Sequence, residues 1–270
     1  EPEEIVRYMD IILAGGIDSP ILIDKYLMGT EVEVDAVCDG EDILIPGIME
    51  HVERAGVHSG DSIAVYPAWN LTGPVTQRLI DCTRKLALAL GTRGLINIQY
   101  VIYENEVYVI EANPRASRTI PYISKVTGLN VVDIATRAML GEKLRDMGCG
   151  TGLYRQSVFA AVKVPVFSFE KLADVDTHLG PEMKSTGEVL GIGRVMEEAI
   201  YKGLLGAGYK MASKGGVLIT VRDRDKAEVV PIARQFAELG FTLYATSGTY
   251  YALARAGIEA NAVGKLHEGH

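Results

Sequence analysis

The first hairpin of the chain is visible in its alternation of apolar and polar residues. In 31–37 (EVEVDAV), valine and alanine occupy one face of an extended chain and acids occupy the other. An Asp39-Gly40 turn leads into a second apolar strand at 43–49. The pattern predicts a half-buried strand with three acids on its open face: Glu31, Glu33 and Asp35.

A second hairpin is expected where two strand-like runs, 95–103 (LINIQYVIY) and 106–112 (EVYVIEA), flank a short turn at 104–106. Gln99 lies in the first run and Glu111 near the end of the second. Because antiparallel pairing brings residues of the two runs opposite each other, the hairpin can set the amide of Gln99 beside the carboxylate of Glu111.

The clearest helix is predicted over 74–90, where apolar residues recur at helical spacing between Pro74 and Gly91. From about residue 211, two strands alternate with two helices, which is typical of a parallel α/β sheet. In all, further helices are expected at 2–14, 130–140, 225–239 and 250–257, and further strands at 20–28, 162–167, 216–221 and 241–246.

Oxygen-bearing side chains gather at the second hairpin and just beyond it. Glu111 and Asn113 lie two residues apart, so they share a face if the strand continues, and Gln99 can join them. One carboxylate and two amides suit Mg²⁺, which takes a few protein oxygens and completes its shell with water and phosphate. Arg115 and Arg118 follow, with guanidinium groups that suit phosphate or carboxylate oxygens. The alternative is a polar sheet face ended by proline.

Two weaker signals fall in the first half of the chain. The loop that contains Gly56, Val57, His58 and Ser59 can offer amides and a hydroxyl to phosphate oxygens, or it is an ordinary surface turn. The stretch around Leu27 can pair with an adenine edge while Glu31 reaches ribose hydroxyls, or it is an edge-strand turn.

The final unit has its own candidate anion site. Thr246-Ser247-Gly248-Thr249 lies between a strand end and a helix start, where hydroxyls, amides and the helix dipole converge. Lys226 and Lys265 can close on a phosphate there. The alternative is simple capping of the helix by threonine or serine.

Composition narrows the function classes. A formal net charge of −8 without a basic run argues against nucleic-acid binding. The three cysteines, Cys38, Cys82 and Cys149, are scattered, which fits a reducing, cytoplasmic compartment and gives no zinc or disulfide framework. No run of about 18 uncharged apolar residues occurs, so no membrane span is expected. The missing initial Met and the two-stranded final sheet suggest that the chain is a fragment.

Long stretches of the chain resemble the ATP-grasp enzymes, and among them the family of carbamoyl-phosphate synthase large subunits. The carrying stretches include EVEVDAVCDGEDILIPGIMEHVERAGVHSGDS, LINIQYVIYENEVYVIEANPRASRT and LGPEMKSTGEVLGIGR. The following KGGVLITVRDRDKAEVV and YATSGT resemble the start of a methylglyoxal-synthase-like allosteric domain. The resemblance implies an α/β chain: an α+β ATP-grasp lobe with a mainly antiparallel sheet (1–165), a connecting segment (166–210) and a truncated parallel α/β regulatory domain (211–270).

The same resemblance implies an activity. It is the phosphorylation of carbamate by ATP with Mg²⁺ or Mn²⁺, in arginine or pyrimidine biosynthesis, with a glutaminase subunit supplying ammonia and a nucleotide monophosphate as effector. The implied metal ligands are Gln99, Glu111 and Asn113; the nucleotide contacts are Leu27, Glu31, Gly56, Val57, His58, Ser59, Gln99 and Glu111; the catalytic arginines are Arg115 and Arg118; and the effector contacts are Lys226, Thr246, Thr249 and Lys265.

The chain also departs from this family. The part of an ATP-grasp enzyme that folds over the triphosphate is expected before residue 1, so the isolated chain is expected to be inactive. Ornithine, an activator of some members, is expected near Glu53 and Asp61, but Val164 replaces an expected carboxylate, which puts ornithine activation in doubt. The rival hypothesis is a non-catalytic regulatory module that binds a nucleotide phosphate.

Overall fold

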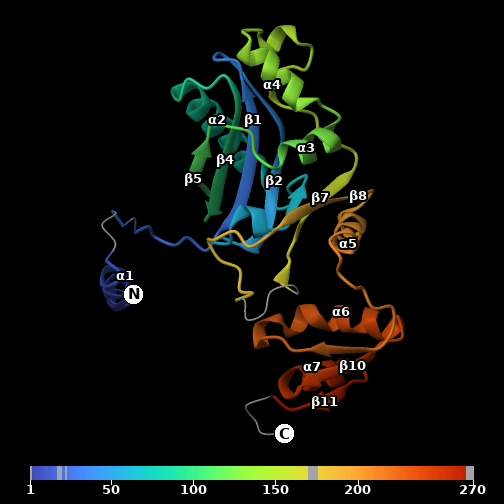
Figure 1. Cartoon of the computed structure of the whole chain (residues 1–270). Helices are drawn as coiled ribbons and strands as arrows, with labels where there is room; N and C mark the ends of the chain where they lie inside the picture. Colours follow the sequence, from blue (N-terminus) through green and yellow to red (C-terminus); the bar gives the residue numbers. More distant parts are fainter. Residues whose placement is uncertain (1, 17–19, 22, 170–175, 266–270) are drawn as a thin grey trace. The chain divides into compact units, whose positions relative to one another are not determined.

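The computed structural model describes residues 2–16, 20–21, 23–169 and 176–265 (Figure 1). The chain divides into two compact units, Glu1–Gly208 and Tyr209–His270. Within the first unit, the segment expected as a connection contributes strand β8 (Gly187–Gly193) and helix α5 (Met196–Gly206). The finer domain assignment stays a prediction.

An eight-stranded sheet forms the centre of the first unit (Figure 1). Its order is β5-β4-β1-β2-β3-β7-β8, and all these neighbours are antiparallel, whereas the short β6 pairs with β2 in parallel. The mainly antiparallel sheet predicted for this lobe is confirmed. The strands not yet bounded are β1 (Thr30–Cys38), β2 (Ile43–Arg54), β3 (Ala64–Tyr66), β4 (Gly94–Tyr103), β5 (Glu106–Asn113), β6 (Gly152–Leu153) and β7 (Ala160–Val166).

Helices α1 (Pro2–Ala14), α2 (Gly73–Ala89) and α4 (Val131–Met139) confirm three predicted helices. Helix α3 (Ile120–Thr127), like α5 and β8, was not predicted; its eight residues are too few to show a clear apolar period. The strand predicted at 20–28 is wrong for the residues described there, because β1 begins only at Thr30 and already has a partner strand on each side.

The two faces of β1 bury different side chains. Val32, Val34 and Ala36 pack with Leu79 of α2 on one face. The opposite face supports α3 and α4 around Val37. The acids of β1 also lie on this second face, but the expectation that they are open to solvent is wrong: Glu31, Glu33 and Asp35 are 6%, 4% and 1% exposed. Polar side chains from distant segments cover them.

The second hairpin is confirmed, with β4 and β5 joined by Glu104 and Asn105. These two residues have φ of 51° and 63°, the left-handed pair required by the tight turn whose twist matches that of the strands. The register places Gln99 opposite Glu111 and Asn97 opposite Asn113. Four amide and carboxylate side chains are therefore directed to one face at the edge of the sheet.

The second unit is a small parallel α/β sheet, as predicted. It contains β9 (Gly216–Ile219), α6 (Lys226–Glu238), β10 (Thr242–Thr246), α7 (Ser247–Arg255) and β11 (Asn261–Val263). The expectation of only two strands is wrong, because β11 pairs in parallel with β10. Its three residues are too short to give a strand signal in the sequence. In the described part of the chain, no helix has the length and apolar character needed to cross a membrane.

Candidate functional site

The predicted oxygen ligands meet on one face of the β4–β5 hairpin. Nδ2 of Asn113 donates to Oε1 of Glu111 at 2.8 Å. Gln99 is the cross-strand partner of Glu111, and its Nε2 donates to Oγ of Ser59 at 3.0 Å. The structure thus brings together four of the candidate residues, from two strands and from the loop at residues 56–62, which we call the glycine loop.

The chemistry of this donor set fits a hard divalent cation. Glu111 is exposed at the edge strand, so its carboxylate can reach an ion that also keeps waters and phosphate oxygens. Asn113 and Gln99 each carry an amide oxygen in addition to the nitrogen that donates in the bonds above. Across the described residues, no group of three or more His, Cys, Asp and Glu side chains is placed to hold a metal ion.

The glycine loop is held rigidly beside the hairpin. Nδ1 of His58 accepts from the amide of Gly60 at 3.0 Å, and the carbonyl of Ser59 accepts from Nζ of Lys163 at 2.8 Å. Asp61 is fully buried and accepts from the amides of Lys184 and Ser185, each at 2.8 Å. The loop is therefore a fixed platform of backbone groups rather than a solvated turn.

The glycine loop also connects to β1. The amide of Gly56, at φ +95°, donates to Oε1 of Glu31 at 2.9 Å. Val57 is buried beside it. Leu27 is half-buried in the irregular segment that precedes β1. A ribose role for Glu31 stays a prediction, since this carboxylate already contacts Gly56 and His51.

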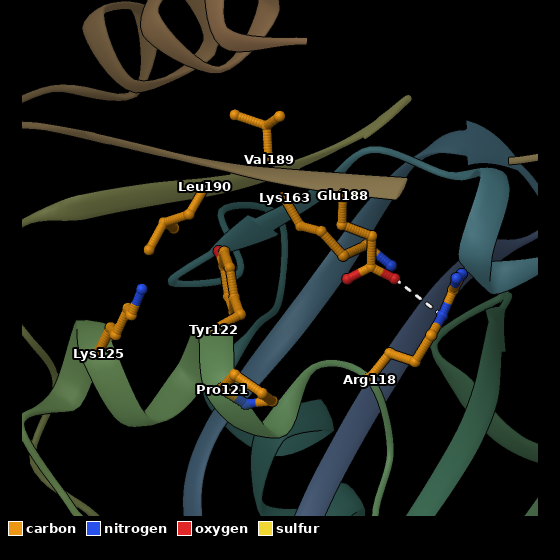
Figure 2. Close-up of a pocket in the computed structure, with 8 residues that line it drawn as sticks. All are labelled: Arg118, Pro121, Tyr122, Lys125, Lys163, Glu188, Val189 and Leu190. Carbon is orange, nitrogen blue, oxygen red and sulfur yellow. Dashed lines mark ion pairs between the residues drawn. The ribbon is translucent and has the colours of Figure 1, made fainter. Parts of the chain in front are cut away.

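The loop that follows β5 presents the two arginines. The amide of Arg115 donates to the carbonyl of Asn113 at 2.8 Å, and the Arg115 side chain is exposed. Nε of Arg118 forms a 3.0 Å ion pair with Glu188 of β8 (Figure 2). Since Glu188 is far from this loop in the sequence, the pairing could not be predicted.

Two neighbouring cavities share these groups. One, of about 230 Å³, is lined by Gln99, His58, Ser59 and Arg115 among others. The second, of about 210 Å³, includes Tyr122 and Lys125 from α3 (Figure 2). Both are lined by Arg118, Lys163 and Glu188. Glu111 and Asn113 do not line either cavity; they lie at the adjacent strand edge.

A buried cluster of charged side chains, formed by Glu31, Glu33 and His51, borders the larger cavity through Glu33. His51 of β2 lies 3.3 Å from Glu31 through Nδ1 and 3.6 Å from Glu33 through Nε2. Burial opposes the imidazolium form, but the two carboxylates outweigh burial and raise the pKa of His51. Burial likewise opposes ionisation of Glu33, but the nearby His51 and the charge of Lys163 lower its pKa to about 2.

Asp35 behaves in the opposite way. Burial and the nearby charge of Glu33 raise the pKa of Asp35 to about 6, although Thr119, Ser117 and Asn97 donate hydrogen bonds to it. Sequence analysis did not assign a site role to Asn97, Lys163 or Glu188. Asn97 could have been found, because it lies two residues before Gln99 on the same strand face, whereas Lys163 and Glu188 come from distant strands without a motif signal.

In the second unit, the structure brings Lys226 to the start of α7. A Cβ atom at Gly248 would lie 2.8 Å from Nζ of Lys226, which also contacts Asp223 at 2.6 Å. Oγ1 of Thr246 donates to Thr220 at 3.0 Å. The buried Thr249 accepts from the amide of Val221 at 3.3 Å. Lys265 also acts on Asp223, since its charge helps to lower the pKa of that carboxyl, after the larger effect of Lys226.

The fold has counterparts among solved structures. It resembles N5-carboxyaminoimidazole ribonucleotide synthetase from Thermotoga maritima with a TM-score of 0.53 and 14% identity, over 73% of this chain and 56% of that one. It also resembles the biotin carboxylase domain of a single-chain bacterial carboxylase with a TM-score of 0.50 and 20% identity, over 67% and 47%. The first unit therefore has the ATP-grasp fold that the sequence predicted.

Sequence comparisons define the family more closely. A family model described as "Carbamoyl-phosphate synthase L chain, ATP binding domain" matches residues 11–147, and one described as "MGS-like domain" matches residues 228–270. The chain belongs to the carbamoyl-phosphate synthase large-chain family.

Curated relatives agree with this assignment. The carbamoyl phosphate synthase large chain of Lachnoclostridium phytofermentans is 55% identical over 98% of this chain and 25% of that protein. The large chain of Clostridium beijerinckii is 54% identical over 99% and 25%. The chain thus spans about a quarter of the length of the curated relatives it matches.

Proposed function

We propose that the first unit is the metal- and nucleotide-binding lobe of a carbamate-phosphorylating site in a carbamoyl-phosphate synthase large chain. Family membership supports the enzyme class. The observation that carries the proposal is the cross-strand pair of Gln99 and Glu111, with Asn113 beside it and two arginines directly after it. This arrangement collects the oxygens and cations that phosphoryl transfer requires.

In the proposed reaction, a carbamate oxygen attacks the γ-phosphorus of ATP, the bond from that phosphorus to the β-phosphate oxygen breaks, and ADP leaves. Glu111, Asn113 and Gln99 would hold Mg²⁺ or Mn²⁺, which neutralises phosphate charge when bound. Arg115 and Arg118 orient the transferring group through charge-assisted hydrogen bonds. The backbone of the glycine loop, held by Lys163, borders the nucleotide.

The wider biology is part of the same proposal. Ammonia would come from a glutaminase subunit, and the product would feed arginine or pyrimidine synthesis. A nucleotide monophosphate would act at the second unit, where Lys226 lies beside the amino end of α7, an arrangement suited to a phosphate. That placement also favours the rival function, a regulatory module that binds nucleotide phosphate without turnover.

A full-length large chain that carries this sequence tests the proposal through ATP formation from carbamoyl phosphate and MgADP. This reverse reaction isolates the phosphoryl-transfer step from ammonia supply. The proposal predicts ATP formation that Glu111→Gln abolishes and that Glu106→Gln, at the other end of β5, leaves intact. Binding of nucleotide monophosphate without any ATP formation by the wild-type protein would instead establish the regulatory module.

A further inference from the structure

The buried carboxylate of Asp35, on strand β1, contacts the loop that contains Arg115 and Arg118. It lies near the middle of β1 and is 1% exposed. Its Oδ1 accepts from Nδ2 of Asn97 at 2.9 Å and from Oγ of Ser117 at 2.7 Å, and its Oδ2 accepts from Oγ1 of Thr119. Two of its three donors therefore belong to a segment more than 80 residues away in the sequence.

Those two donors flank Arg118. Because Ser117 and Thr119 both donate to Asp35, the segment is held at two points against β1. Their hydroxyl oxygens also lie 2.6 Å from each other. At the other end of the loop, the amide of Arg115 donates to the carbonyl of Asn113. A loop that contains two exposed cationic side chains is thus anchored to strands at both ends.

The physical reason for such anchoring is entropic. A free loop loses conformational entropy whenever it must hold a side chain in one place, and misplacement by about 1 Å can cost about 100-fold in rate. A buried carboxylate also loses its hydration, so it stabilises the one loop conformation that supplies its donors. Asp35 therefore favours a single position of Arg118 before any ligand binds.

We infer that Asp35 is a positioning residue, which holds the Arg115–Arg118 loop in its working conformation through Ser117 and Thr119. The inference rests on the proposed roles of Arg115 and Arg118 in phosphoryl transfer. Asp35 itself does not line either cavity.

The test compares Asp35→Ala and Asp35→Asn in the full-length large chain, with Tyr100→Phe as control. The asparagine keeps the shape of the side chain, an oxygen that can accept from Ser117, and an amide that can donate to the hydroxyl oxygen of Thr119. Tyr100 makes a buried 2.8 Å hydrogen bond with Thr83 on the α2 face of the same sheet. The control therefore removes a buried polar contact without touching the loop.

The first readout does not depend on catalysis. Native trypsin digestion followed by mass spectrometry measures cleavage after Arg115 and Arg118. Asp35→Ala should speed these cleavages by about tenfold or more, because the loop opens locally, whereas Asp35→Asn and Tyr100→Phe should match wild type. Equal cleavage in Asp35→Ala and wild type would overturn the inference, and so would equal acceleration in Asp35→Ala and Tyr100→Phe.

The second readout is ATP formation from carbamoyl phosphate and MgADP. Asp35→Ala should lower kcat by about tenfold or more with KM for MgADP changed less than about twofold, and Asp35→Asn should restore most of kcat. If Asp35→Ala does not fold, the milder Ser117→Ala with Thr119→Val makes the same comparison. A wild-type protein that forms no ATP would refute the proposed function, while the cleavage comparison would still decide whether Asp35 positions the loop.

Discussion

Gln99 donates from Nε2 to Oγ of Ser59 at 3.0 Å, while its backbone lies opposite Glu111 in the β4–β5 hairpin. Gln99 therefore connects the position opposite Glu111 in the hairpin with the glycine loop. An ion at Glu111 and a phosphate at the loop would be held in fixed relation by this connection, which is the requirement for in-line transfer between positioned groups.

The first prediction concerns the metal site. Glu111→Gln in the full-length large chain should lower ATP formation from carbamoyl phosphate by about 100-fold or more, because it removes the only carboxylate of the donor set. Manganese binding followed by electron paramagnetic resonance should weaken in parallel. Glu106→Gln serves as the control, since Glu106 pairs only with the exposed Arg78 at 3.2 Å among the ion pairs described. Normal activity of Glu111→Gln would remove Glu111 from the mechanism.

The sequence predicted the contacts between residues that are close together in the chain and missed those between residues that are far apart in it. The hairpin of Gln99 and Glu111 followed from local alternation and a short turn predicted at 104–106, which are encoded within about twenty residues. The burial of Asp35 did not follow, because its cover comes from Thr119, 84 residues away. The polar face of a strand with alternating residues can lie in solvent or against a buried polar network. Only the tertiary structure distinguishes these two environments.

The second prediction concerns pH and Asp35. The pKa of Asp35 is about 6 in the folded protein, above the ordinary value of 3.8, so the folded state binds the carboxyl proton more tightly than the unfolded chain does. The associated stability is fully present below pH 3.8 and is lost as pH rises through about 6. Asp35→Asn lacks this titration. Its free energy of unfolding, relative to wild type, should therefore rise by up to about 3 kcal/mol between pH 4 and pH 7.

Urea unfolding of both proteins across this pH range measures the difference. His51 and Glu33 titrate in both proteins, so their contributions largely cancel in the comparison. A difference that stays constant with pH would show that Asp35 titrates as it does in the unfolded chain.

The third prediction concerns the 270-residue chain by itself. It should not form carbamoyl phosphate or ATP, because Glu111, Arg115 and Arg118 are exposed and water would compete for every charge that the reaction uses. Calorimetry with millimolar MgATP should detect at most weak binding, and Gln99→Ala should reduce it further. Robust turnover by the purified chain would contradict this expectation.

The last prediction concerns regulation by the second unit. Thr249→Ala should weaken the response of the full-length enzyme to uridine or inosine monophosphate more than it lowers basal activity, because the proposed phosphate site lies in a different unit from Glu111. The buried Thr249 hydroxyl also accepts from the amide of Val221, so the variant should lose about 1 kcal/mol of stability. Lys226→Met separates the two effects, since the half-buried Lys226 pairs with the exposed Asp223 and does not contact the Thr249 hydroxyl in the bonds given above. The measurement is activity titrated against each nucleotide, with Thr242→Ala, at the opposite end of β10, as control. A loss of basal turnover with an unchanged effector response would place the loop in catalysis and refute the division of roles between the two units.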